Sequence, residues 1–126
     1  MEKTITLHLT DDRSLLRNDG TGDYKVDEQG NIDIYGYMQD ERFYNEAWLV
    51  CLHELIEQRL TQHRGIREEE IDAYDRNICE KGGVADEAGN ERGCIYYKEH
   101  HFAECIERLA ANELGMNWED YYQYYI

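Results

Sequence analysis

The stretch Trp48–Asp75 reads WLVCLHELIEQRLTQHRGIREEEIDAYD, with HELIE at positions 53–57 as its centre. Residues four apart on an α-helix project from the same side, so His53 and Glu57 can reach one point in space. Glu54 projects about 100° further round the helix. The apolar residues around these positions predict a buried helix. Polar side chains on a buried helix are unusual and indicate that they serve a purpose there. The sequence therefore predicts a site on this helix.

The composition predicts an acidic globular protein. A chain of 126 residues with 41% hydrophobic content fits one domain (1–126), with a β-rich part at 1–39 and a helical part at 40–126 that carries the candidate site. The formal charge of −15 argues against a phosphate-backbone binder, which needs clustered Lys and Arg, so we expect no direct nucleic-acid binding. The same charge suits cations, basic partners or imitation of nucleic acid.

The start of the chain and the cysteines predict a cytoplasmic protein that is neither secreted nor inserted in a membrane. The N-terminus has no apolar signal core, and no apolar run approaches the length of a membrane span. Cys51, Cys79, Cys94 and Cys105 form no C-x-x-C pair, and disulfides are not expected without a secretion signal. Cys51 and Cys105 fall within predicted helices, where cysteine usually behaves as a small buried hydrophobe.

The N-terminal part predicts a small sheet. Lys3–Thr10 alternates in the manner of a strand, and Asp23–Val26 and Ile32–Met38 are two further extended runs. The turn between the last two contains Gly30, which can supply a positive φ, so they predict a hairpin. We therefore expect an α+β fold in which a three-stranded antiparallel sheet packs against two or three main helices.

The helical part predicts three main helices. The first begins after Asp40 as N-cap and ends at Gly65, the second covers Arg67–Asn77, and the third covers Tyr96–Gly115. Cys79–Gly93 is glycine-rich and predicts a mobile loop, and no internal repeat at a fixed period is evident. Mostly apolar residues recur at helical spacing in the third helix: Tyr97, His101, Phe102, Cys105, Ile106, Leu109 and Leu114.

The third helix repeats the pattern of the first. His100 and Glu104 stand four apart, Glu107 follows one turn later, and His101 is adjacent. Two helices that each offer an imidazole and carboxylates can build a site between them. We prefer His100 to His101 because it shares a stripe with the two glutamates. Histidine and glutamate together suit Zn²⁺, Fe²⁺ or Mn²⁺ better than Ca²⁺ or Mg²⁺.

The sequence His53-Glu54-x-x-Glu57 resembles the HExxH helix of zincin metallopeptidases, with glutamate in place of the final histidine. The resemblance implies a minimal zincin-like fold and a metal, Zn or another divalent ion such as Mn or Fe. It implies that His53 and Glu57 are ligands, that Glu54 is the general base on a metal-bound water, and that His100 is the third ligand. The region from Trp48 to Gly115 is also similar to uncharacterised proteins encoded by phages and prophages.

The leading expectation is a metal-binding protein, with metallopeptidase-like hydrolysis as its chemistry. Glu104 is a further predicted ligand, and the predicted outer residues are Asp72, Asp75, His101 and Glu107. One alternative is a non-enzymatic phage product that inhibits a host protein or imitates nucleic acid, with a host or phage protein as partner. Another is a two-metal site held by glutamates of both helices: Glu54, Glu57, Glu104 and Glu107. A His/Glu pair at this spacing also occurs as a simple ion pair.

Overall fold

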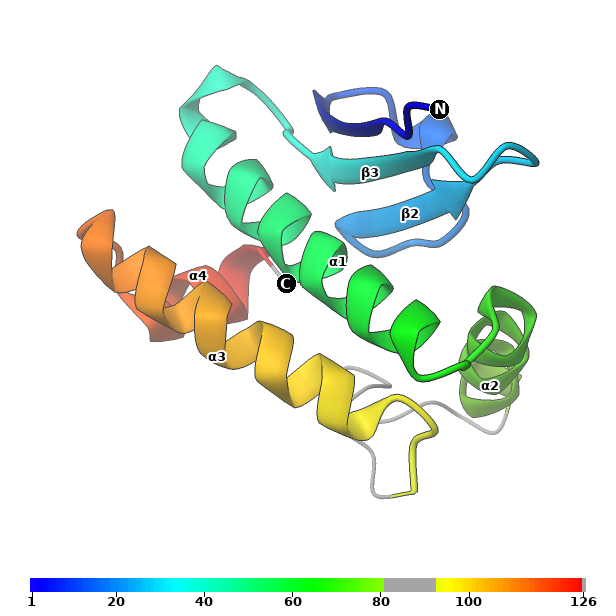
Figure 1. The fold of residues 1–126 in the computed structure, drawn as a ribbon. Helices are drawn as coiled ribbons and strands as arrows, with labels where there is room; N and C mark the ends of the chain where they lie inside the picture. Colours follow the sequence, from blue (N-terminus) through cyan, green and yellow to red (C-terminus); the bar gives the residue numbers. More distant parts are fainter. Residues whose placement is uncertain (81–92, 126) are drawn as a thin grey trace.

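The computed structural model describes residues 1–80 and 93–125, except for the side chains of 76–80 and 124. A three-stranded sheet lies against one side of the long helix α1 (Tyr44–His63), and helix α3 (Tyr97–Glu113) lies along the other side (Figure 1). The α+β prediction is confirmed. No helix in the described part of the chain has both the length and the apolar character needed to cross a membrane.

The sheet is mixed, so the prediction of a purely antiparallel sheet is wrong. Strands β2 (Gly22–Val26) and β3 (Ile32–Tyr37) form the predicted antiparallel hairpin, with Gly30 at φ +85° in its turn. Strand β1 (Ile5–Thr10) pairs with β3 in parallel, which gives the order β1-β3-β2. The connection 11–21 is long enough to leave room for β3 between β1 and β2, so that β3 forms hydrogen bonds with both.

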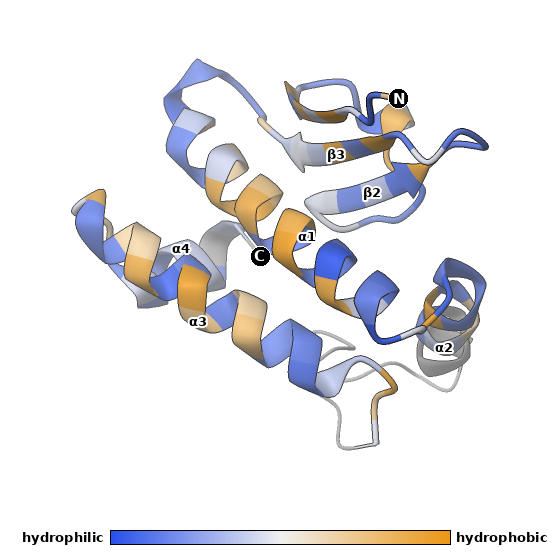
Figure 2. Cartoon of the chain, viewed as in Figure 1, coloured by the Kyte–Doolittle hydropathy of each residue, from blue (hydrophilic) through white to orange (hydrophobic). Residues whose placement is uncertain are grey.

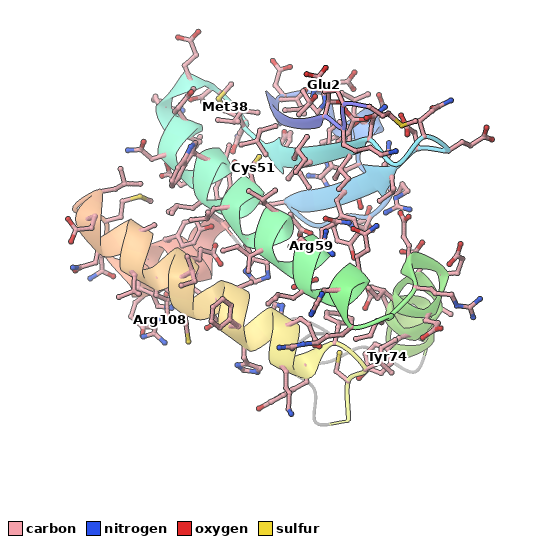
Figure 3. The ribbon with its side chains drawn as sticks, viewed as in Figure 1. Glu2, Met38, Cys51, Arg59, Tyr74 and Arg108 are labelled. Atoms are coloured by element: carbon pink, nitrogen blue, oxygen red, sulfur yellow. The ribbon has the colours of Figure 1, made fainter. Side chains whose placement is uncertain are left out.

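Helix α1 approaches the sheet closely because glycine faces it. A Cβ atom at Gly36 of β3 would overlap the carbonyl oxygen of Ala47 and lie 2.8 Å from Sγ of Cys51. Beside this contact, Cys51 packs with Ile34 and Ile32 in an apolar cluster between sheet and helix. Figure 3 shows Cys51 on α1 at the level of the sheet. Backbone contact of this kind fixes the position of the helix against the strands.

Each long helix is followed by a short one through the same turn. Gly65 (φ +76°) leads from α1 into α2 (Glu68–Glu80), and Gly115 (φ +71°) leads from α3 into α4 (Trp118–Tyr125). The backbone hydrogen bonds of the two turns correspond residue by residue. The sequence shows no repeat because the correspondence lies in the backbone and in the burial pattern, while most side chains differ.

The helix boundaries differ from the predictions by a few residues. Asp40 caps a short 3-10 turn, Glu41–Phe43, that precedes α1, and α2 continues to Glu80. Beyond the third predicted helix, the chain continues into a fourth helix, α4, which begins at Trp118. Most of the loop predicted over Cys79–Gly93 lies outside the described residues.

Helix α3 buries polar residues and exposes apolar ones. Its buried positions are Glu99, His100, Ala103, Glu107 and Ala111. Phe102 is 53% exposed, Leu109 is 66% exposed, and Cys105 is also exposed, so the expectation of a buried Cys105 is wrong. Apolar residues recur along the α3 ribbon in Figure 2. The face with fewer apolar side chains is turned inward because the polar residues of α3 meet those of α1.

Candidate metal centre

Three side chains from the two long helices converge on one point. Nε2 of His53 lies 2.9 Å from Oε2 of Glu57 and 3.2 Å from Nδ1 of His100. Nδ1 of His100 lies 3.0 Å from the same Glu57 oxygen. The three atoms form a nearly equilateral triangle, and all three residues are buried. α1 supplies His53 and Glu57 from successive turns, and α3 supplies His100 across the interface.

While Glu57 is ionised, no placement of protons makes all three contacts of this triangle hydrogen bonds. The Glu57 carboxylate oxygen accepts hydrogen bonds, so each of the two imidazole nitrogens is a donor toward it. Two donors then face each other at the 3.2 Å that separates His53 Nε2 from His100 Nδ1. A cation between the three atoms removes the conflict, because each of them can direct a lone pair at it.

A second carboxylate orients the ring of His53 from behind. Oε1 of Glu107 lies 2.8 Å from Nδ1 of His53, and its other oxygen accepts a hydrogen bond from the hydroxyl of Tyr121. Glu107 is only 1% exposed. If Nδ1 carries the proton, the lone pair of Nε2 points at the triangle. Metal-ligating histidines are commonly held by such a carboxylate, which also makes the ring a stronger ligand.

The carboxylates control the ionisation of the group. Burial lowers the pKa of His53, but its hydrogen bonds to Glu107 and Glu57 outweigh burial and raise that pKa well above its ordinary value. Burial acts on Glu57 in the opposite direction, and hydrogen bonds from His100 and His53 overcome it and lower the pKa of Glu57. Glu57 is therefore ionised at neutral pH. A metal would replace protons that the imidazoles otherwise hold.

Asp75 of α2 lies at the margin of this cluster. Its Oδ1 accepts a hydrogen bond of 2.7 Å from the hydroxyl of Tyr96, whose ring centroid is 6.3 Å from that of His100. Burial raises the pKa of Asp75 to about 6, against the hydrogen bond from Tyr96 and with a contribution from the charge of Glu57. Asp75 thus occupies a position suited to the outer role predicted for it.

The other predicted site residues lie away from the triangle. The side chain of Glu54 lies against Gly22 of the sheet, where an added Cβ would be 2.7 Å from its Oε1. Glu104 is 3.8 Å from Nε2 of His100, on the side of the ring that faces away from the triangle. Asp72 is 3.4 Å from Arg17 on the surface. The ring of His101 contacts Tyr97 and does not join the group.

The triangle has the dimensions of a ligand face. On tetrahedral Zn²⁺ with bonds of 2.0–2.1 Å, ligand atoms lie about 3.3 Å apart. On one face of an octahedral Fe²⁺ or Mn²⁺ site with bonds of about 2.1 Å, they lie about 3.0 Å apart. The observed 2.9–3.2 Å separations match both within small side-chain adjustments. Three protein ligands among the described residues are the number that catalytic zinc sites use, with a further position left for water or substrate.

Two tyrosines of the site were not predicted from the sequence. Tyr96 precedes His100 by four residues, so helical spacing could have placed it on the same face. No local signal connects Tyr121 with Glu107, because the turn at Gly115 determines where α4 returns.

Comparison of the chain with family models, curated proteins and solved structures finds no match.

Proposed function

We propose that this protein binds one divalent transition metal ion through His53, Glu57 and His100. The observation that carries the proposal is the triangle of three buried ligand atoms separated by 2.9–3.2 Å. Around an ionised Glu57, hydrogen bonds alone leave one of the three contacts unsatisfied, because both imidazole nitrogens donate to the same oxygen and also face each other. Glu107 behind His53 supports the proposal, because it occupies the place of the outer carboxylate in many metal sites.

We infer that the chemistry is hydrolysis, since a metal with three protein ligands can lower the pKa of a bound water. Glu54 is poorly placed to act as the general base, because its side chain lies on the sheet side of α1. Asp75 is the better placed carboxylate, since its Tyr96 partner packs near His100. The zincin-like assignment and the relation to phage proteins stay predictions.

The acidic surface supports a second candidate function. A formal charge of −15 suits a protein that binds a basic partner, including one that normally holds nucleic acid. This function needs no buried imidazoles, so it predicts that the triangle can be removed without loss of binding. The two-metal alternative lacks a corresponding observation, because Glu54 and Glu104 lie apart from the triangle.

Metal analysis of protein purified without a histidine tag tests the proposal. We expect about one equivalent of a transition metal in the wild type, because one cluster among the described residues offers three ligands. His53→Ala and His100→Ala should each lose it. His63→Ala is the matched control, since His63 is an exposed residue in the last turn of α1. Protein that holds no metal and does not take up Zn²⁺, Mn²⁺ or Fe²⁺ on titration would refute the proposal.

A further inference from the structure

The outer face of α3 carries a stripe of exposed apolar side chains. Phe102, Cys105 and Leu109 follow one another at intervals of three and four residues, which places them on one side of the helix. Phe102 and Leu109 are 53% and 66% exposed, and Cys105 is exposed. This is the side opposite His100 and Glu107, so nothing in the metal centre accounts for it.

The charge of this face differs from that of the whole protein. The charged residues among the exposed positions of α3 are Lys98, Arg108 and Glu113. Two cations and one anion occupy this face, although the chain carries −15 overall. Arg108 points away from α1 in Figure 3, and its guanidinium lies 5.2 Å from the ring of Trp118. Two acidic molecules that meet through their α3 helices therefore repel each other less than their overall charge would suggest.

We propose that α3 is the contact surface between two copies of this chain, packed antiparallel about a two-fold axis near Cys105. In this register Phe102 of one copy faces Leu109 of the second copy. The same register brings Lys98 of one copy to Glu113 of the second copy. A two-fold interface must be self-complementary, and the apolar pair and the charge pair satisfy that condition together. The arrangement buries the stripe and leaves both metal centres on the inner faces of their helices.

The size of the helix limits the strength of this contact. Its 17 residues make α3 about 25 Å long, and helices are about 10 Å wide. Two such faces bury roughly 500 Å², which is below the ~1,200 Å² typical of stable interfaces. We therefore expect a reversible dimer whose population depends on protein concentration.

Sedimentation velocity over a concentration series tests the proposal. The wild type should shift toward a dimer as concentration rises, and Phe102→Glu should weaken association at least tenfold. Tyr44→Glu is the matched control, because Tyr44 is a large aromatic residue of α1 that is 57% exposed. It should leave association within twofold of the wild type. A wild type that remains monomeric at about 1 mM, or a dimer unaffected by Phe102→Glu, overturns the proposal.

Charge reversal tests the register. Lys98→Glu places two carboxylates opposite each other at both ends of the interface, so association should weaken. Adding Glu113→Lys to that variant restores opposite charges, and association should return to near the wild-type value. Both positions are exposed, so neither change disturbs the fold. If the double variant associates no better than Lys98→Glu alone, the antiparallel register is wrong.

Discussion

Replacing Glu107 by glutamine should weaken metal binding while leaving the fold intact. The amide oxygen of the new side chain can still accept a hydrogen bond from Nδ1 of His53. The amide nitrogen then faces Tyr121, whose hydroxyl can turn to accept. The side chain keeps its volume at a position that is 1% exposed, so no cavity forms. The substitution therefore removes one negative charge and little else.

The expected loss follows from the contact between Glu107 and His53. The carboxylate lies 2.8 Å from the ring nitrogen that faces away from the triangle, so it makes the ring a stronger ligand. Loss of such outer partners typically weakens metal affinity about 10- to 100-fold, which corresponds to about 1.4–2.7 kcal/mol. Alanine would be less informative, because removing one partner from a buried pair costs about 3–5 kcal/mol of stability by itself.

Competition with a chromophoric chelator measures zinc affinity for the wild type and the variant at one pH. Circular dichroism of both proteins without metal checks that the fold is unchanged. Glu104→Gln makes the same chemical change three residues earlier, at a carboxylate 3.8 Å from His100. Since that distance exceeds a hydrogen bond, we expect less than about a threefold change in affinity.

Two results would contradict this reasoning. If Glu107→Gln binds zinc within twofold of the wild type, the carboxylate does not support a metal-bearing histidine. If Glu104→Gln loses more affinity than Glu107→Gln, Glu104 is a ligand and the triangle is misassigned.

Three further predictions concern stability. Zn²⁺ at 100 times its dissociation constant should stabilise the protein by about 2.7 kcal/mol and raise the melting temperature by roughly 10 °C, and His100→Ala should abolish the shift in calorimetry. Gly36→Ala should lower stability by about 1–3 kcal/mol in urea titrations, because the added methyl group meets the backbone at Ala47; an unchanged midpoint would contradict the contact. The fold raises the pKa of Asp75 to about 6, so this carboxyl group binds more protons in the native state than in the unfolded state between about pH 4 and 6. Its contribution to stability therefore falls as pH rises through that range. In chelator-treated protein, Asp75→Asn should therefore gain stability relative to the wild type at pH 7 compared with pH 4.5, and parallel pH profiles would exclude the effect.

The local elements could be predicted from the sequence, but their arrangement could not. The alternating residue pattern predicted the strands, and the glycines at 65 and 115 predicted where the two long helices end. The parallel pairing of β1 with β3 has no local signal, because strand order depends on where the connection 11–21 crosses. The repeated turn geometry of the two helical pairs was not predicted because most of their side chains differ.

The site could be predicted in part, because helical spacing places residues on faces without deciding which face is buried. The spacing of four residues predicted that His53 pairs with Glu57 and that His100 pairs with Glu104. For the first pair both members lie in the triangle. For the second, His100 presents Nδ1 to the triangle, and Glu104 lies near the opposite ring nitrogen. Which ring nitrogen of His100 faces the triangle depends on side-chain torsions, and a sequence pattern carries no information about them.

Helix α1 holds two of the candidate ligands in position before any metal binds. On the side of α1 that faces the sheet, the Ala47 backbone packs closely against Gly36, and this contact holds the helix in position. The other side of α1 carries two of the three converging ligand atoms. α1 cannot move toward a metal without losing the glycine contact, so any adjustment must come from side-chain torsions or from α3. The separations already lie within a few tenths of an ångström of those on a metal, so torsions suffice. This arrangement explains why α3 turns its polar face inward: the cost of burying those groups is offset only if they meet partners held in place by α1.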